Sequence, residues 1–320
     1  MYWREWIVLL LFLAVVASVF VGATTLLLRR LLGRTPSPHP AAVAGRWTVY
    51  LLALGGLLCV LYGFLEPYWP EVTYVTIPSR RMPPGARFRI AQISDLHCEA
   101  VPRIEGVLPE LVAAQSPDAI VFTGDAINRI EGLPIFRDCM TQLARIAPTF
   151  AVRGNWDVLR WKDADLFGGT GVTVLDKGAV PVRAGGAEVW IAGARLFAEW
   201  LPAAALEQAP RHAPRVLLYH LPQGIKAAAA DGADLCLVGH VHGGQVRLPG
   251  YGALVALSPF NKKYEAGLYR VKDTWLYVNR GIGLQGDAAP RVRFLCRPEI
   301  TILDLVPEEL VLPSAAGRAP

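Results

Sequence analysis

The sequence predicts an α/β domain, a sandwich of two β-sheets flanked by helices, that is preceded by two transmembrane helices. Two long apolar runs without charge stand at the N-terminus. Beyond them, short strand-like runs alternate with helical ones, and the last third of the chain reads mainly as strands. Alternation of this kind is typical of sheets covered by helices on their outer faces. Residues 87–307 are long enough to bury one sizeable core.

The excess of apolar residues lies in the first 66 residues. Trp6–Leu28 is a run of 23 residues without a charge, and Trp47–Leu65 is another of 19. At about 1.5 Å per residue, a helix of either length can cross a hydrocarbon core about 30 Å thick. A cleaved signal peptide is the alternative for the first run, but its positive charges mostly follow it, which favours a retained helix. Residues 1–66 are therefore expected to form a membrane anchor.

The loop between the two runs, Arg29–Arg46, contains four arginines and no acidic residue. It accounts for almost all of the chain's net charge of +5. This distribution indicates membrane topology and gives no reason to expect a nucleic-acid partner. By the positive-inside rule the loop is cytoplasmic, which places everything after Leu65 on the outer side of the cell membrane. Arg80 and Arg81 lie within reach of the second run and weaken that orientation.

The remaining segments are assigned in chain order. Residues 67–86 contain five prolines and are expected to form a semi-rigid connector. The domain is expected over 87–307, followed by a disordered tail over 308–320. Apolar residues at helical spacing predict helices, and runs of strand-forming residues predict late strands. The helices are Arg103–Gln115, interrupted by Pro109, and Pro134–Ile146; the strands are Gln245–Leu248, Tyr264–Val271, Trp275–Val278 and Glu299–Leu305.

Five apolar strands each end in side chains that can bind a metal. The strands are Arg87–Ser94, Asp118–Thr123, Thr149–Arg153, Arg215–Tyr219 and Leu235–Val238. The side chains that follow them are Asp95 and His97, Asp125, Asn155, His220, and His240 and His242. Carboxyl ends of strands are where open α/β folds keep their sites. His240 and His242 point the same way on extended backbone, so both imidazoles can reach one ion or two neighbouring ions.

In chain order these motifs read Asp-x-His, Gly-Asp, Gly-Asn-x-Asp, a single His and Gly-His-x-His. That series, from Asp95 to His242, resembles the calcineurin-like metallophosphoesterases. The resemblance implies the same two-sheet fold and a metal-dependent hydrolase of phosphoric esters or anhydrides. Gly239–Leu248, Asn279–Gly283 and Arg297–Ile300 look most like bacterial members of the family that are membrane-anchored or secreted.

The resemblance also implies roles for individual residues. Asp95, His97 and His242 would hold one divalent ion, Asn155, His220 and His240 a second, and Asp125 would bridge the two. Two ions about 3.5 to 4 Å apart can share a bridging hydroxide that attacks phosphorus in line. Asp125, Asn155 and His220 are accordingly the expected catalytic positions. Oxygen and imidazole ligands suit Mn, Fe or Zn, and the sequence does not choose among them.

One position departs from the family pattern. Most members carry a histidine after Gly-Asn, thought to contact the phosphate and protonate the leaving oxygen, but here the residue is Trp156. An indole N–H can donate a hydrogen bond and is no useful acid. We therefore expect a preference for phosphoanhydrides or activated diesters over alkyl monoesters. Asp157, which would orient that histidine, is expected to pair with Arg153 or Arg160, or to be a surface carboxylate.

The resemblance implies that the substrate is a phosphate-containing small molecule or lipid. Some family members that cleave the pyrophosphate of UDP-diacylglucosamine also lack the histidine, which suggests a lipid-linked or nucleotide-linked pyrophosphate, although that lipid is made on the cytoplasmic side. Trp156, Arg153 and Arg280, with Lys262 and Lys263, are candidate substrate contacts, but structural or solvated roles are the commoner account of such basic residues. Two alternatives stay open: a general phosphodiesterase or phosphomonoesterase without lipid specificity, and a non-catalytic, membrane-tethered metal-binding scaffold.

Overall fold

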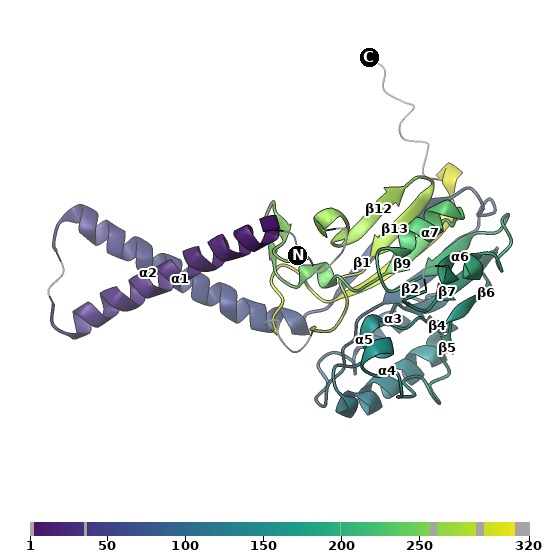
Figure 1. Ribbon diagram of the computed structural model, residues 1–320, viewed down its shortest axis with the longest axis horizontal. Helices are drawn as coiled ribbons and strands as arrows, with labels where there is room; N and C mark the ends of the chain where they lie inside the picture. The colour runs from purple at the N-terminus through teal and green to yellow at the C-terminus, as the bar shows by residue number, and fades with distance from the viewer. Residues whose placement is uncertain (1–2, 35–36, 199, 257–260, 286–290, 311–320) are drawn as a thin grey trace, which may run out of the picture.

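Two long helices form a hairpin that projects from an α/β domain (Figure 1). The computed structural model describes residues 3–34, 37–198, 200–256, 261–285 and 291–310. Helix α1 spans Trp3–Leu31 and α2 spans Pro40–Leu65. Proline is tolerated in the first turn of a helix, where its missing N–H would have no partner. Arg29, Arg30 and Arg46, which were expected in the loop, thus lie within the helices.

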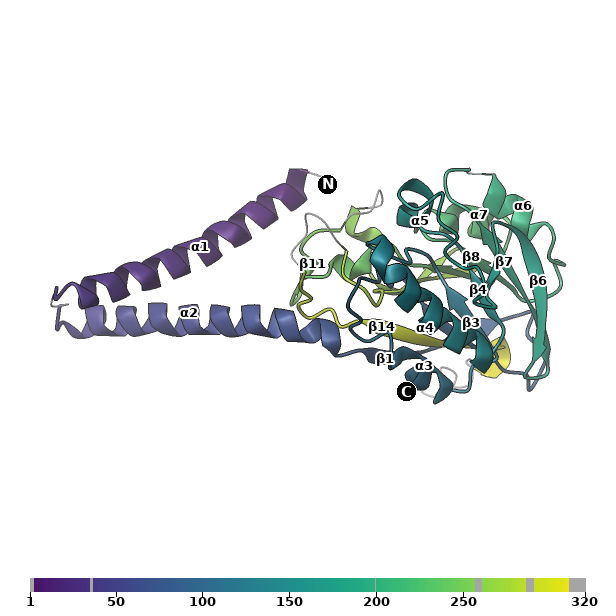
Figure 2. The same cartoon turned by 90° about the horizontal axis from the view of Figure 1, so that it is seen from below.

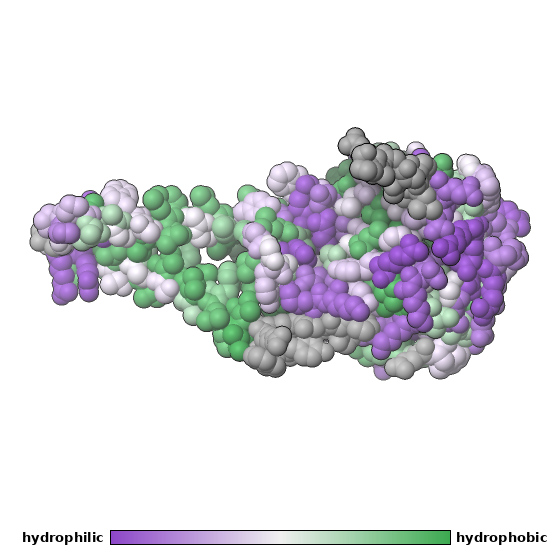
Figure 3. All heavy atoms as spheres, turned by 90° about the horizontal axis from the view of Figure 1, so that it is seen from above, coloured by the Kyte–Doolittle hydropathy of each residue, from purple (hydrophilic) through white to green (hydrophobic). Residues whose placement is uncertain are grey.

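Both helices are long and apolar enough to cross a membrane, over Trp6–Leu31 and Pro40–Tyr68. Their side chains are largely exposed, and Figure 3 shows an apolar surface along much of the hairpin. Exposed apolar helices of this length are costly in water, because about 25 cal/mol is lost for each Å² of apolar surface left uncovered. The two helices are therefore candidate membrane spans.

The domain contains two six-stranded sheets. The strands of the first sheet are β1 (Glu71–Ser79), β2 (Phe88–Ile93), β3 (Ala119–Phe122), β4 (Thr149–Ala151), β5 (Thr173–Val174) and β14 (Glu299–Pro307). Those of the second are β6 (Lys177–Ala184), β7 (Ala187–Ala194), β8 (Arg215–Leu218), β9 (Leu235–Val238), β12 (Gly267–Val271) and β13 (Thr274–Val278). Their orders are β1-β14-β2-β3-β4-β5 and β12-β13-β9-β8-β7-β6. A small separate hairpin pairs β10 (Arg247–Leu248) with β11 (Gly252–Ala253).

The core lies in three layers, as a helix-covered sandwich requires. Residues from both sheets, such as Phe88, Val121 and Leu237, form one buried cluster between the sheets. Helices α3 (Leu108–Ala113) and α4 (Leu133–Ile146) bury residues in a second cluster over the first sheet. Helices α6 (Leu201–Leu206) and α7 (Gly224–Ala230) do the same over the second. The predicted fold class is confirmed.

The proline-rich segment 67–86 differs from the predicted connector. It begins within the short 3-10 helix η1 (Glu66–Tyr68) and contains β1, which pairs in parallel with β14 along all nine of its residues. Pro78 is tolerated because β1 is an edge strand, where a missing N–H need not break the ladder. Nine residues of the segment, Glu71–Ser79, thus form the outer strand of the first sheet.

Other boundaries shift for local reasons. Helix α3 is six residues long, and the predicted start at Arg103 lies outside it. Pro109 fits only in the first turn of a helix, so the helix begins at Leu108. Of the predicted strand Gln245–Leu248, Arg247 and Leu248 pair with β11, and Val246 forms only an isolated bridge with Phe294. The predicted tail begins with the 3-10 helix η5 (Glu308–Leu310), and its remainder lies outside the described residues.

Candidate metal centre

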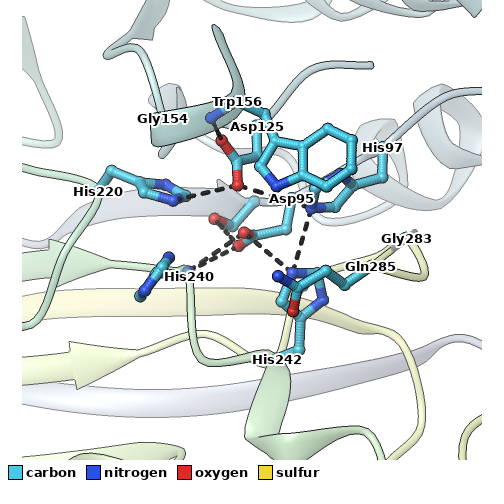
Figure 4. A network of polar contacts seen from close by, with 12 residues as sticks. Asp95, His97, Asp125, Gly154, Trp156, His220, His240, His242, Gly283 and Gln285 are labelled. Carbon is cyan, nitrogen blue, oxygen red and sulfur yellow. Dashed lines mark hydrogen bonds and ion pairs between the residues drawn. The ribbon is translucent and has the colours of Figure 1, made fainter. Parts of the chain in front are cut away.

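The predicted ligands converge at the carboxyl ends of parallel strands from both sheets (Figure 4). Strands β2 and β3 are parallel neighbours in one sheet, and β8 and β9 are parallel neighbours in the other. Five of the seven residues have left-handed backbone, with φ between 44° and 70°: Asp95, His97, Asp125, His240 and His242. Such conformations cost about 1 to 3 kcal/mol each in non-glycine residues and cluster at functional sites. The sharp turns they make direct every side chain into one space.

One group consists of Asp95, His97 and His242, whose ligand atoms all lie within 4.8 Å of one another. His242 Nε2 lies 3.3 Å from Asp95 Oδ1 and 3.2 Å from His97 Nε2. All three side chains are buried, and both histidines face the same point through Nε2. Three ligands around a common point fit one divalent ion.

The second group consists of Asp125, His220 and His240, again within 4.8 Å. His220 Nε2 lies 3.3 Å from Asp125 Oδ2 and 3.0 Å from Asn155 Oδ1. With its proton on Nδ1, His220 donates a hydrogen bond to the Thr123 carbonyl oxygen at 2.6 Å. That bond leaves the Nε2 lone pair free to bind an ion, which is the usual way in which a protein sets a ligand tautomer.

Asp125 lies between the two groups. Its Oδ2 is 3.3 Å from His220 Nε2 in its own group and 3.6 Å from His97 Nε2 in the other. Its Oδ1 accepts a hydrogen bond from the backbone N–H of Trp156 at 2.8 Å. One carboxylate that reaches both groups, with imidazoles and an amide oxygen around it, is a donor set that fits two divalent ions.

Burial and charge set the protonation of the histidines. Burial lowers the pKa of His97 and of His240 to about 4 each, so both imidazoles are neutral, as metal ligands must be. For His220 burial also lowers the pKa, but the Asp125 carboxylate raises it more, to about 9, so that without an ion Nε2 also carries a proton, which a bound ion would replace. The two buried carboxylates therefore attract positive charge strongly, which is the electrostatic condition for holding cations.

Asp157 has a different role from either of the predicted ones. It is buried; its Oδ2 accepts from the backbone N–H groups of Gly154 at 2.7 Å and Asp125 at 2.9 Å, and its Oδ1 from Ala126 at 2.8 Å. The expectation that it pairs with Arg153 or Arg160, or lies on the surface, is wrong. Burial, with the charge of Asp125 added, raises the pKa of Asp157 to about 6. Asp157 fixes the two turns that carry Asp125 and Asn155.

A polar residue that the motif analysis missed holds Asp95. Ser94 Oγ donates to Asp95 Oδ2 at 2.5 Å, and Thr123 Oγ1 donates to Ser94 Oγ at 2.6 Å. Gly239 allows this approach, because a Cβ there would lie 1.9 Å from Ser94 Oγ. A serine placed directly before the first ligand was the only available signal, and such a pair is common by chance.

Of the three predicted substrate contacts, one lies beside the metal ligands and two form ion pairs. Trp156 is half-buried at the site, its ring edge-on to His97 with 5.1 Å between centroids, and the Arg160 guanidinium lies 4.2 Å from the ring centroid. Arg153 pairs with Asp176 at 2.9 Å. Arg280 pairs with Glu71 at 2.9 Å and with Glu299 at 3.1 Å. Both arginines are thus engaged by acidic side chains of the domain.

The two lysines of the loop after β11 are also engaged. Lys262 Nζ contacts the Glu265 carboxylate at 2.5 Å and lies 4.0 Å from the Tyr251 ring centroid. Lys263 lies 5.1 Å from the ring centroid of Tyr264. The basic residues that the sequence offered as phosphate contacts therefore have partners of their own. The two ligand groups and Trp156 are the part of the predicted site that the structure brings together.

Comparison with known proteins gives the family. A sequence model of the Calcineurin-like phosphoesterase family matches residues 88–244. The chain is 31% identical over 254 residues to the uncharacterized metallophosphoesterase YkuE of Bacillus subtilis, over 76% of this chain and 87% of that protein. It is 32% identical over 238 residues to the phosphodiesterase YaeI of Escherichia coli, over 69% and 83%. An uncharacterized metallophosphoesterase of Aquifex aeolicus is 28% identical over 259 residues, covering 76% and 95%. Because these relatives align over most of their length, the chain belongs to the calcineurin-like metallophosphoesterases and is a metal-dependent phosphoester hydrolase.

Proposed function

We propose that this protein is a membrane-anchored phosphohydrolase that uses two divalent ions to cleave a phosphodiester or a phosphoanhydride. The observation that carries the proposal is the pair of ligand groups that meet at Asp125. Asp95, His97 and His242 would hold one ion, and Asn155, His220 and His240 the other. Ions bound there would act as Lewis acids on the phosphoryl oxygens and lower the pKa of water. Mn, Fe and Zn all suit these ligands.

The leaving group follows from Trp156. Its backbone N–H holds Asp125, and its ring lies beside His97 at the place where the family motif has an acid. Loss of a general acid costs about 10²- to 10⁴-fold for a poor leaving group such as an alkoxide. A phosphate, a nucleotide or a nitrophenolate leaves without a proton, so these substrates are favoured. The phosphodiesterase activity named for YaeI supports diesters, and a lipid-linked or nucleotide-linked pyrophosphate fits equally.

The anchor is proposed from the two apolar helices. With α1 and α2 both crossing the cell membrane, the arginine-rich turn lies on the cytoplasmic side and the domain on the outer side. The arrangement is consistent with the fold, since the N-terminal end of α1 and the C-terminal end of α2 lie at the same end of the hairpin, next to the domain (Figure 2).

The test is hydrolysis by the full-length protein with Mn²⁺. The substrates are bis-p-nitrophenyl phosphate, a UDP-linked pyrophosphate and an alkyl monoester, with Asp125→Ala as the control. Diester or anhydride cleavage that Asp125→Ala abolishes supports the proposal. Alkyl monoester cleavage at an equal rate would contradict the leaving-group argument and favour a general phosphoesterase. If metal binds but none of the three is cleaved, a binding scaffold is the better account.

A further inference from the structure

The metal centre lies at the end of the domain that is nearest to the membrane helices. Strand β1 begins six residues after α2 ends, and its Thr73 pairs in register with Thr301 of β14. Thr301 in turn pairs in register with Gln92 of β2, which lies three residues before Asp95. Two strand spacings amount to about 10 Å. The start of β1 and the ligand Asp95 therefore share one edge of the first sheet.

The ligand loop that follows β9 of the second sheet lies at the same end of the domain. Gly244, next to the ligand turn at His242, packs against β11, and a Cβ at Gly244 would lie 2.5 Å from that of Ala253. Figure 2 shows β11 at the end of the domain that faces the helical hairpin. The ligand loops of both sheets thus lie on the hairpin side.

A buried contact joins the end of α2 to the ligand loop. Glu66 follows α2 directly and is buried, and its Oε1 accepts a hydrogen bond from the Cys296 N–H at 2.8 Å. Cys296 Sγ in turn donates to the carbonyl oxygen of His242 at 3.2 Å. One residue therefore separates the end of the membrane helix from a metal ligand.

Arg293 makes a second connection and is fully buried. Its backbone N–H donates to the carbonyl oxygen of Gly63 in α2 at 3.0 Å. Its guanidinium donates to the carbonyl oxygens of Gly281 at 3.0 Å and Gly283 at 2.6 Å. Gly283 N–H donates to the Asp95 carbonyl oxygen at 2.7 Å. The helix and the ligand loops are thus parts of one packed unit, which fixes the height of the site above the membrane.

The same end of the domain presents apolar side chains. Tyr68, Trp69 and Leu295 are 59%, 58% and 46% exposed, and Leu295 lies between Cys296 and Phe294, whose ring packs on Tyr62 of α2. Tyrosine and tryptophan are enriched where a protein meets lipid headgroups. In Figure 3 the apolar surface of the hairpin runs up to the domain. This edge is therefore built to lie at the lipid–water interface.

We propose that the substrate is a phosphodiester or phosphoanhydride carried by a lipid of the bilayer in which the enzyme is anchored. The inference rests on the proposed function and on α2 as a membrane span. A site at this edge reaches phosphates in the headgroup layer, which is about 5 to 8 Å deep on each side of the bilayer. Water adds to phosphorus, the bond from phosphorus to the leaving oxygen breaks, and the proton goes to solvent.

The test measures release of the same leaving group, p-nitrophenolate, from a lipid that either shares a nanodisc with the enzyme or does not. The full-length protein is placed in nanodiscs that also contain a phospholipid with p-nitrophenol as its headgroup, and release of p-nitrophenolate is measured. In a second sample the enzyme and the lipid occupy separate nanodiscs. Bis-p-nitrophenyl phosphate in solution serves as the common reference. We expect the lipid to be cleaved at least tenfold faster when it shares a nanodisc with the enzyme, with equal cleavage of the soluble diester.

The outcomes distinguish failure of the lipid-substrate inference from failure of the proposed phosphohydrolase function. Cleavage of the soluble diester without cleavage of the lipid, or equal lipid cleavage in the two samples, would overturn the inference and leave the proposed function intact. If neither diester is cleaved, both are overturned.

Matched variants localise the effect. Leu295→Asn, which keeps a residue that tolerates left-handed backbone, should reduce lipid turnover more than turnover of the soluble diester. Leu310→Asn is the control, since Leu310 is 62% exposed and follows the far end of β14. It should leave both rates unchanged, and an equal loss of lipid turnover in the two variants would contradict a bilayer contact at Leu295.

Discussion

At the residue scale, the proposed preference for good leaving groups rests on Trp156. Trp156→His places an imidazole beside His97 while the backbone N–H that holds Asp125 is kept. We expect kcat/KM for an alkyl monoester to rise about 10- to 100-fold, because a general acid contributes about 10²- to 10⁴-fold where it is fully positioned. Turnover of bis-p-nitrophenyl phosphate should change little. Trp156→Phe is the control, and equal gains on both substrates would contradict the argument.

Asp157 is expected to matter for stability and for metal binding together. Asp157→Ala leaves the buried N–H groups of Asp125, Ala126 and Gly154 without their acceptor. Each such loss costs about 1 to 3 kcal/mol, so the free energy of unfolding should fall by at least about 2 kcal/mol. Metal affinity, measured by titration calorimetry, should fall as well. Asp163→Ala removes an exposed acid nearby and should alter neither quantity.

The ligands could be predicted from the sequence, and their supports could not. Asp95, His97 and His242 stand directly after apolar strands in the order of the family pattern, and the resemblance to that pattern assigned them to one ion. Ser94 and Asp157 act through a neighbouring side chain and through backbone N–H groups. Those partners come together only when turns distant in sequence pack against each other, which no local pattern records.

At the element scale, β1 is expected to be indispensable to the domain. It pairs with β14 along nine residues, and its Ile77 is fully buried between the sheets. A fragment of residues 80–320 would expose β14 as a bare edge, which favours aggregation. A fragment of 66–320 keeps β1 and Glu66 and should unfold cooperatively and bind metal. Thermal unfolding monitored by circular dichroism distinguishes the two, and equal melting temperatures would show that β1 is dispensable.

The same strand marks the limit of sequence reasoning about elements. Central strands such as β3 and β9 are short apolar runs, buried on both faces, and stand out as such. The run that forms β1 alternates polar and apolar residues, ends at Pro78–Ser79 and lies among other prolines, so its composition resembles that of a spacer. Only its pairing with β14, more than two hundred residues later, makes it a strand.

At the scale of the whole molecule, helix α2 and the domain form one packed unit. Helix α2 is followed directly by buried Glu66, so the chain leaves no free linker between the span and the sheet. If α2 spans the membrane as proposed, the side that its C-terminal end reaches is therefore the side of the metal centre. The two apolar runs predicted the helices, but their rigid attachment depends on Arg293 and Cys296, which lie near the other end of the chain.

The orientation can be tested with single cysteines. Of the five native cysteines, Cys59 alone is exposed, and it lies within α2, so Cys59→Ser gives a background with low labelling. In that background, Asp163→Cys should react with a membrane-impermeant maleimide in intact cells, because the domain is proposed to lie outside. Ser37→Cys, in the arginine-rich turn, should react only after permeabilisation. The reverse pattern would place the metal centre in the cytoplasm, where its lipid substrate would come from the inner leaflet.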